Sequence, residues 1–333
     1  MLPPRNREDD QAVLIAGNAN LTLAQNIAKA YGEILADATI GRFSDGEIRV
    51  EINQNLRGRH VFLIQPTCPP VNDNLMELLV MADACRRASA SSITAVVPYF
   101  GYARQERKSA SRSPITSKLV ADMMVSSGID RLLSLDLHAP QIQGFFNIPV
   151  DNLYAMPVIA ADIQEKQPDM RNTVIVSPDV GGVRRARALA KELDCPIAII
   201  DKRRDNPNES AVLHVIGDVK GKNCILLDDM VDTAGTLVNA AKALRETHGA
   251  AQISAYATHG VLSGPAIERI CDSQLTEVVL TDTIRHNLPS HCKNIRFINA
   301  APLLAEAMHR IITGESLSAL FTSPPARALN QAE

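Results

Sequence analysis

Tryptophan is absent from the 333 residues, and aromatic side chains make up only 4% of them. The core therefore has to be packed mainly from aliphatic side chains, and the hydrophobic share of 46% is sufficient to build one. No apolar run approaches the ~20 residues of a membrane-spanning helix. The stretch Met1–Gln11 contains two prolines and several charges, which is unlike a signal peptide. We expect a cytoplasmic protein with no membrane partner.

A dominant charge of either sign is also missing. Lys and Arg number 34 and Asp and Glu number 37, so the net charge is −3. A nearly balanced chain lacks the broad basic surface of a nucleic-acid binder, and we expect no nucleic-acid partner. Cysteine never forms a Cys-x-x-Cys pair, which predicts small core residues in a reducing compartment. The six cysteines are Cys68, Cys85, Cys195, Cys224, Cys271 and Cys292.

Short apolar runs alternate with segments of helical periodicity along the chain. This alternation predicts an α/β fold with mostly parallel sheets flanked by helices. The pattern occurs twice, because Val13–Ala16, Val61–Ile64 and Ile93–Val96 have counterparts about 160 residues later in the same order. We expect the last helix to pack on the first domain. The expected parts are two duplicated α/β domains, 12–155 and 156–321, and two flexible tails, 1–11 and 322–333.

The segment Asp228–Thr236 carries the clearest chemistry. It follows the apolar run Cys224–Leu227, a predicted buried strand, and precedes a segment with helical spacing. Free N–H groups at a helix N-terminus bind phosphate, whereas two adjacent carboxylates suit sugar hydroxyls or a metal. The combination predicts a site for a phosphorylated sugar. The alternative is that Thr233 and Thr236 only cap the helix and that Asp228 is a solvated acid.

Two other loops follow predicted strands. Ser177–Arg185 contains adjacent glycines, which let backbone N–H groups approach an anion. Asp179 in that loop opposes anion binding unless a cation joins it, and Mg²⁺ between the carboxylate and a diphosphate satisfies both. Asp136 and His138 follow another strand and share a face at strand spacing. The alternatives are a Gly-Gly turn into a helix and a hydrogen-bonded histidine at a strand end.

Three further segments carry charge or an aromatic ring out of predicted elements. Asp201–Arg204 is a basic run after a buried strand, and such cations stabilise the charge that develops in phosphoryl transfer. Tyr99–Lys108 leads into a polar, serine-rich loop suited to closing over polyphosphate. Phe43–Glu47 lies on a predicted turn, where a phenylalanine beside acids suits a nucleobase. Solvated charge, a surface loop and a core phenylalanine are the respective alternatives.

Together these segments resemble the ribose-phosphate pyrophosphokinases (phosphoribosyl diphosphate synthetases) of the phosphate-dependent class I type, over about Ala12–Phe321. The resemblance implies that ATP gives its β,γ-diphosphate to the 1-hydroxyl of ribose 5-phosphate, yielding 5-phosphoribosyl 1-diphosphate and AMP for nucleotide biosynthesis. It also implies that the two duplicated domains are phosphoribosyltransferase-like, that Mg²⁺ is the cofactor, and that the protein is a homo-oligomer, usually a hexamer. No Gly-x-x-x-x-Gly-Lys-Ser/Thr stretch is present, so ATP would bind without a P-loop.

The resemblance also assigns residues to roles. Ribose 5-phosphate would be bound by Arg204, Asp228, Asp229, Asp232, Thr233, Ala234, Gly235 and Thr236. The transferred diphosphate would lie on Asp179, Val180, Gly181 and Gly182, and Mg²⁺ near His138, Asp179 and Asp136. The catalytic residues would be Lys202, Arg204, Arg104 and Arg107. ATP would contact Phe43, Asp45, Gly46, Glu47, Arg104 and Gln105, the first four usually from a neighbouring subunit.

The sequence departs from the family where regulation is concerned. The family's Ser-x-Arg-Gly stretch begins here with Asn55, although Arg57 keeps the charge and Ser316 and Ser318 match the other half of that site. The lost hydroxyl argues against activation by inorganic phosphate and inhibition by ADP. Arg285 stands where the family has proline, with no evident reason.

Two other functions are compatible with parts of the sequence. A non-catalytic regulatory relative would have lost catalytic residues, whereas Lys202, Arg204 and Arg104 are present. A phosphoribosyltransferase that consumes phosphoribosyl diphosphate would explain Asp228–Thr236, but not the duplicated domain.

Overall fold

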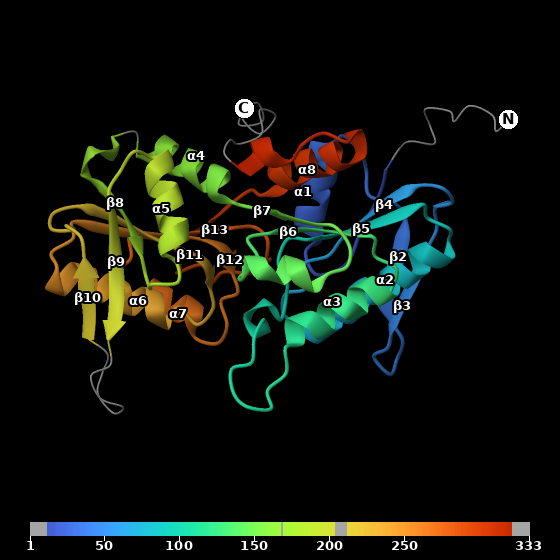
Figure 1. Ribbon diagram of the computed structural model, residues 1–333, viewed down its shortest axis with the longest axis horizontal. Coiled ribbons are helices and arrows are strands. Elements are labelled where there is room, and N and C mark those ends of the chain that lie inside the picture. Colours follow the sequence, from blue (N-terminus) through green and yellow to red (C-terminus); the bar gives the residue numbers. More distant parts are fainter. Residues whose placement is uncertain (1–11, 168, 204–211, 322–333) are drawn as a thin grey trace. The chain divides into compact units, whose positions relative to one another are not determined.

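The computed structural model describes residues 12–167, 169–203 and 212–321, with the backbone alone at 202, 203, 212 and 213 (Figure 1). Contacts separate the chain into two units. Unit 1 comprises the chain up to Tyr154, Thr283–Arg285 and the segment from Ala300 onward, and unit 2 comprises Ala155–Asp282 and His286–Asn299. Thr283–Arg285 therefore group with unit 1, although the sequence analysis placed them in the second domain.

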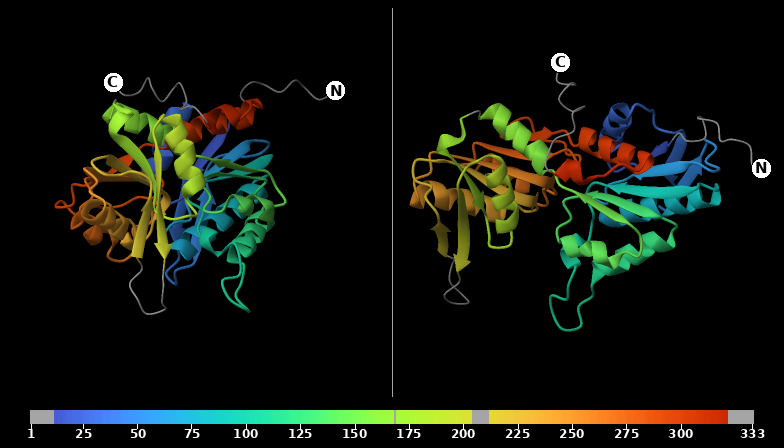
Figure 2. Two further views of the ribbon diagram at one scale, coloured as in Figure 1. Left: turned by 60° about the vertical axis from the view of Figure 1, so that its left-hand side comes forward. Right: turned by 45° about the horizontal axis from the view of Figure 1, so that its top comes forward.

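Unit 1 is built on a five-stranded parallel sheet in the order β1-β4-β5-β6-β7. Its strands are β1 (Val13–Ala16), β4 (His60–Ile64), β5 (Ser92–Val97), β6 (Arg131–Leu135) and β7 (Val150–Leu153). A separate antiparallel hairpin joins β2 (Ala38–Arg42) to β3 (Ile48–Ile52). The helices are α1 (Leu21–Tyr31), α2 (Val71–Arg87), α3 (Thr116–Ser126) and α8 (Ala301–Thr313), of which α1 and α8 lie side by side (Figure 2).

Unit 2 is built on a seven-stranded sheet in the order β10-β9-β8-β11-β12-β13-β14. Only β10 runs antiparallel to its neighbour. The strands are β8 (Thr173–Ser177), β9 (Ile197–Arg203), β10 (Val212–Ile216), β11 (Asn223–Val231), β12 (Gln252–Gly260), β13 (Glu277–Thr281) and β14 (Ile295–Ile298). The helices are α4 (Met156–Lys166), α5 (Val183–Glu192), α6 (Gly235–Lys242) and α7 (Ala266–Cys271), and a π-helical turn, Ala243–Thr247, follows α6.

The two units repeat one order of elements. In unit 1 the order is β1, α1, β2, β3, β4, α2, β5, α3, β6 and β7, and in unit 2 it is β8, α5, β9, β10, β11, α6, β12, α7, β13 and β14. Each copy thus has an antiparallel pair, β2–β3 or β9–β10, inserted between its first two parallel strands. The predicted fold class, a duplicated α/β unit with mostly parallel sheets, is confirmed.

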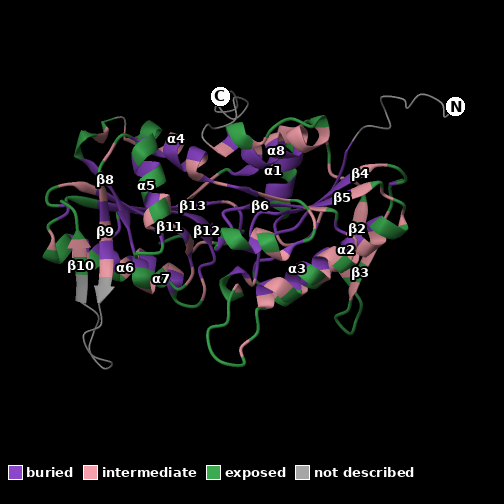
Figure 3. Ribbon diagram, in the orientation of Figure 1, coloured by how far each residue is buried: buried purple, intermediate pink, exposed green. Residues whose placement is uncertain are grey.

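The cores are aliphatic, as the scarcity of aromatic residues requires. Val61–Ile64 of β4 and Cys224–Leu227 of β11 are buried throughout, because helices cover both faces of these central strands (Figure 3). Fully burying one such side chain contributes roughly 1.5–3 kcal/mol relative to exposure. Helix α1 shows how local signals fix an element, since the Asn20 side chain caps its start and Gly32 ends it in a left-handed conformation. None of the helices placed in the described ranges combines the length and apolar character of a membrane span.

One prediction about cysteine is wrong. Cys271 at the end of α7 and Cys292 before β14 form a disulfide, with their Cα atoms 5.2 Å apart. The pairing depends on α7 packing beside a loop 21 residues further along, which spacing in the sequence does not reveal. Cys68, Cys85 and Cys224 are free and buried as predicted, and burial raises the pKa of the Cys85 thiol to about 12.

Candidate active site

Four residues with a left-handed backbone follow strands at the carboxyl edges of the two sheets. They are Tyr102 after β5, Asp136 after β6, Ala234 after β11 and Leu262 after β12, with φ angles of 64°, 42°, 59° and 50°. Such conformations cost non-glycine residues roughly 1–2 kcal/mol each and cluster at functional sites. In open α/β sheets, ligands bind at this same edge. The strained positions therefore mark the carboxyl edges as the functional edges of both units.

Asp228 and Asp229 lie within β11, which continues to Val231. The strand predicted from the apolar run Cys224–Leu227 is therefore confirmed but extends further, and the two acids lie near its end. The cause is the long neighbour β12, which supplies ladder partners beyond the apolar run, pairing Ala257 with Asp228 and Gly260 with Val231. The two carboxylates are thus carried on rigid backbone rather than on a loop.

The guanidinium of Arg185, in the preceding helix α5, bridges this acidic pair. The Nη1 atom of Arg185, in α5, lies 3.5 Å from Asp228 Oδ1 and 3.4 Å from Asp229 Oδ1. The backbone N–H of Asp229 also donates to Asp228 Oδ1 over 2.8 Å. Asp229 is only 5% exposed, so the pair is largely withdrawn from water. Arg185 belongs to the predicted loop Ser177–Arg185 but has no predicted role, because the residues around it in the sequence do not reveal its contact with Asp228 and Asp229.

Burial is the main cause of an unusual pKa at this site. Burial and, to a smaller extent, the neighbouring carboxyl of Asp229 raise the pKa of Asp228 to about 8, while the Arg185 guanidinium and the Asp229 N–H oppose the rise. A carboxylate pair in this state gains from any ligand that donates hydrogen bonds or carries positive charge. Sugar hydroxyls are such donors.

The loop after β11 is open for an anion. Helix α6 begins at Gly235, and its N-cap, Ala234, has a left-handed backbone and no side-chain capping bond within the described structure. The alternative that a threonine caps this helix is therefore wrong. Arg269, in α7, donates from Nη1 to the carbonyl oxygen of Thr233 over 3.0 Å and fixes the loop. Uncapped N–H groups beside the hydroxyls of Thr233 and Thr236 suit a phosphate.

The loop after β8 approaches a ligand through its backbone. Asp179 Oδ1 accepts a hydrogen bond from the Gly182 N–H over 2.8 Å. This bond holds the Asp179 carboxylate at the start of α5, since Gly182 immediately precedes the helix. A Cβ atom on Gly182 would lie 2.9 Å from the Ser177 hydroxyl, so this position requires glycine. Val180 is exposed at the tip, next to Gly181. One oxygen of Asp179 is thus engaged by the loop, which limits how it can bind a cation.

The prediction that Asp136 and His138 share a strand face is wrong. Strand β6 ends at Leu135, and the left-handed backbone of Asp136 breaks the alternation. Asp136 is buried, whereas His138 is exposed. Asp179 belongs to unit 2 and these two residues to unit 1. Across the described ranges, no three His, Cys, Asp or Glu side chains form a group that could hold a metal.

The segment after β5 is anchored at its base. Ser117, in α3, donates to the Tyr102 carbonyl oxygen over 2.9 Å, and Thr116 donates to the Gln105 side chain. Arg104, which lies between these two anchored residues, is exposed. Arg107, which follows them, is also exposed, and its Nε atom lies 3.3 Å from Glu106 Oε1. These cations therefore extend from a fixed base at the carboxyl edge of unit 1.

The turn of the β2–β3 hairpin exposes an aromatic ring. Phe43 is 52% exposed, so the alternative of a core phenylalanine is wrong. The Phe43 N–H donates to the Glu47 carbonyl over 2.8 Å, and Gly46, with φ of 96°, donates back to the Phe43 carbonyl over 3.0 Å. Asp45 Oδ1 accepts from the Glu47 N–H over 3.1 Å. A closed turn thus presents the ring and two acids to solvent.

Some predicted residues cannot be placed by their side chains. Lys202 lies in β9, where only the backbone is described, and Arg204 lies outside the described residues. In the regulatory stretch, Asn55 Oδ1 accepts from the Arg57 N–H over 3.1 Å, and Arg57 is exposed. Ser316 Oγ accepts from the Ser318 N–H over 3.2 Å.

Arg285 is exposed, and nothing in the structure explains its presence.

Comparisons with known proteins cover nearly the whole chain. The family described as the N-terminal domain of ribose phosphate pyrophosphokinase matches residues 12–128, and the phosphoribosyl synthetase-associated domain matches 202–322. A ribose-phosphate pyrophosphokinase from Marinomonas sp. (strain MWYL1) is 57% identical, over 93% of this chain and 98% of its own. One from Rhizobium meliloti (strain 1021) is 56% identical, over 92% and 99%. The crystal structure of phosphoribosylpyrophosphate synthetase from Mycobacterium smegmatis is 41% identical and covers 91% of this chain and 99% of its own, with a TM-score of 0.86.

Proposed function

The chain belongs to the ribose-phosphate pyrophosphokinase family, and on that premise we propose how its residues divide the reaction. It is an enzyme that transfers the β,γ-diphosphate of ATP to the 1-hydroxyl of ribose 5-phosphate, giving 5-phosphoribosyl 1-diphosphate and AMP. Its place is in nucleotide biosynthesis, and its product also suits histidine, tryptophan and NAD synthesis.

One observation carries the assignment of the sugar site: the acidic pair bridged by Arg185 lies on the strand that leads into an uncapped helix N-terminus. Asp228 and Asp229 would accept hydrogen bonds from the ribose hydroxyls. Asp232–Thr236 would bind the 5-phosphate through backbone N–H groups and hydroxyls. The acids lie in one strand and the phosphate loop follows it, so a phosphorylated sugar would be held at its two ends.

The diphosphate and ATP are proposed to use the remaining loops. Asp179–Gly182 would cradle the transferred diphosphate, and the turn Phe43–Glu47 would contact adenine and ribose. Arg104 and Gln105 would complete the ATP site. Lys202 and Arg204, with Arg107 as a helper, would stabilise the negative charge of the transition state.

Mg²⁺ is the cofactor that we propose, because carboxylates in the predicted loops are ligands of the type that it prefers. Mg²⁺ binds one or two protein carboxylates and fills its octahedron with phosphate oxygens and water, so it needs no cluster of three side chains. The carboxylates of Asp179 and Asp136 are suitable donors, whereas His138 would act through water. The ion, when bound, neutralises charge on the polyphosphate.

The direct test is production of AMP from ribose 5-phosphate and Mg-ATP by the purified protein. We expect turnover in the ordinary range for such transfers, roughly 1–100 per second. A regulatory relative would form no AMP above background. A phosphoribosyltransferase would be inert with ATP but would release diphosphate when given phosphoribosyl diphosphate and a base. Either result would overturn the proposed function.

Regulation by phosphate is expected to be weak. Asn55 Oδ1 accepts from the Arg57 N–H, which holds the side chain in place and leaves a bulkier amide where the family's serine hydroxyl would donate to a phosphate. We therefore expect a nearly flat rate in a titration with inorganic phosphate, and a rising response in Asn55→Ser. A wild-type enzyme activated as strongly as Asn55→Ser would show that Arg57 and the two serines suffice.

We also propose a homo-oligomer, a hexamer as is usual in the family, because the turn at Phe43 would serve the ATP site of a neighbouring subunit. The proposed compartment is the cytoplasm, where the nucleotide substrate is available.

A further inference from the structure

Unit 1 has its own cavity at the carboxyl edge of its sheet. The cavity measures about 460 Å³ and is bounded by the chain after β1, strand β2, the chain after β4 and the first turns of α2. In the duplicated order of elements, this is the place that the acidic pair and Arg185 occupy in unit 2. The inherited binding position is thus kept in unit 1, but with different residues.

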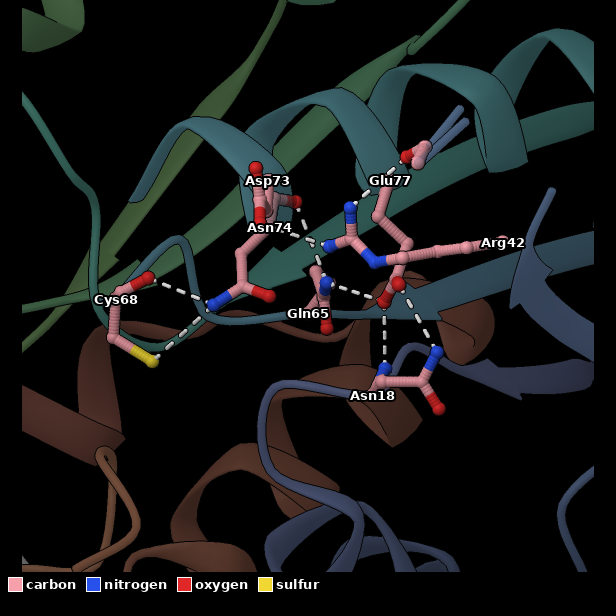
Figure 4. Close-up of polar contacts among 8 residues, drawn as sticks. Asn18, Arg42, Gln65, Cys68, Asp73, Asn74 and Glu77 are labelled. Atoms are coloured by element: carbon pink, nitrogen blue, oxygen red, sulfur yellow. Dashed lines mark hydrogen bonds and ion pairs between the residues drawn. The ribbon is translucent and has the colours of Figure 1, made fainter. Parts of the chain in front are cut away.

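A buried carboxylate organises those residues (Figure 4). Glu77, in α2, is 5% exposed and accepts three hydrogen bonds. Its Oε1 accepts from the Asn18 N–H and from Gln65 Nε2, both over 2.7 Å, and its Oε2 accepts from Asn18 Nδ2 over 3.0 Å. The Gln65 side chain packs directly against the backbone of Gly17, because a Cβ atom added to Gly17 would lie only 2.3 Å from Gln65 Oε1. The cluster thus gives the cavity a carboxylate and amide side chains in place of the acidic pair and guanidinium of unit 2.

The same cluster reaches the hairpin that exposes Phe43. Asn18 Nδ2 also donates to the carbonyl oxygen of Ile40, in β2, over 3.2 Å. At the next turn of the hairpin, Arg42 donates from Nη2 to Asp73, in α2, over 2.9 Å and from Nη1 to the Gly46 carbonyl over 3.2 Å (Figure 4). The hairpin is not hydrogen-bonded to the main sheet, because β2 and β3 form their own two-stranded sheet. Its polar ties to the rest of the unit therefore include these side-chain bonds to the β1 loop and α2.

We propose that Asn18 and Glu77 are positioning residues for ATP, which hold the hairpin so that its turn meets the nucleotide. This inference rests on the proposed function, in which Phe43, Asp45 and Glu47 contact ATP. The network lies within one unit of one chain, so it acts equally whether the hairpin serves its own subunit or a neighbour. The duplicated unit has thus exchanged a ligand site for a support of the ATP site.

A carboxylate is suited to this task because it accepts all three donors without a donor of its own. In Glu77→Gln, the amide N–H₂ must face Asn18 or Gln65 donors, so a buried donor loses its partner. Asn18→Ala is milder, because Asn18 is exposed and its backbone N–H still reaches Glu77. It removes only the link through Nδ2 to Glu77 and to Ile40.

The test is steady-state kinetics of Asn18→Ala and Glu77→Gln beside wild type, with melting temperatures recorded for each. Loss of charge-assisted hydrogen bonds predicts a rise in the KM for ATP of about 10-fold in Glu77→Gln and a smaller rise in Asn18→Ala, with an unchanged KM for ribose 5-phosphate. Phe43→Ala is the positive control and should raise the KM for ATP. Asp83→Asn, at an exposed ion pair with Arg87 on the same helix, is the matched neutral control.

The outcomes separate the two levels of inference. A wild-type protein that forms no AMP would contradict the proposed function itself. An active enzyme in which Phe43→Ala raises the KM for ATP and Asn18→Ala does not would overturn the positioning role alone. A lower melting temperature with both KM values unchanged would assign the network to stability only. Should Glu77→Gln fail to fold, Asn18→Ala still decides the question.

Discussion

Replacing Lys202 by alanine is expected to lower kcat by about 10³-fold, with a change in the KM for ATP of less than about 10-fold. Lys202 lies in β9, beside β8, whose carboxyl end leads into the proposed diphosphate loop. A cation at that edge would experience the greatest negative charge while the diphosphate is being transferred from the leaving oxygen of AMP to the 1-oxygen of ribose 5-phosphate. Its contact is therefore stronger in the transition state than in the ground state, and its loss appears in kcat.

The measurement is kcat and KM for both substrates in Lys202→Ala and in Lys191→Ala, an exposed lysine at the end of α5. Lys191→Ala controls for the loss of one positive charge from unit 2 and should match wild type. Equal losses in kcat and in ATP affinity for Lys202→Ala would assign Lys202 to substrate binding instead.

Replacing Arg185 by glutamine is expected to lower kcat/KM for ribose 5-phosphate at pH 7 by about 10²-fold, with partial recovery above pH 9. In the proposed sugar site, Asp228 would accept a hydrogen bond from a ribose hydroxyl more strongly when ionised than when protonated, and burial and Asp229 raise its pKa to about 8. The wild-type value should therefore rise with pH and level off above about pH 8. Without the guanidinium, the pKa of Asp228 should be higher than in the wild type. The rise of kcat/KM for ribose 5-phosphate with pH should therefore occur at higher pH.

The matched control is Arg184→Gln, at the exposed neighbouring position of α5, which should keep the wild-type profile. Stability gives a second readout with a defined sign. The pKa of Asp228 is higher in the folded protein than in the unfolded chain, so the folded state binds more protons. Its contribution to the ligand-free enzyme is complete below about pH 4 and is lost as the pH rises through about 8. A profile of Arg185→Gln that coincides with wild type would show that the guanidinium does not act on the pair.

The strands and helices that flank the site were predictable because their signals are local. Val61–Ile64 and Cys224–Leu227 are continuous apolar runs, and both became central strands. The hairpin strands β2 and β3 were missed, since they are only partly buried and their short polar alternation is a weak signal. The loop after β11 was predicted to be a phosphate site from Asp228–Thr236 alone, because one short segment carries both the acids and the helix start.

The sequence alone therefore determined the duplicated α/β architecture and the family, and it supplied the prediction of the phosphosugar segment; all three depend on neighbours along the chain. Only the tertiary structure showed that Arg185 bridges the acidic pair and that Asn18 links Glu77 to the hairpin. It also decided the pairing of Cys271 with Cys292 and the placing of both acids within β11. The physical reason is common to these cases. A charged, polar or thiol group takes its partner from whatever packing brings within about 3–4 Å, and elements far apart in the sequence make that packing.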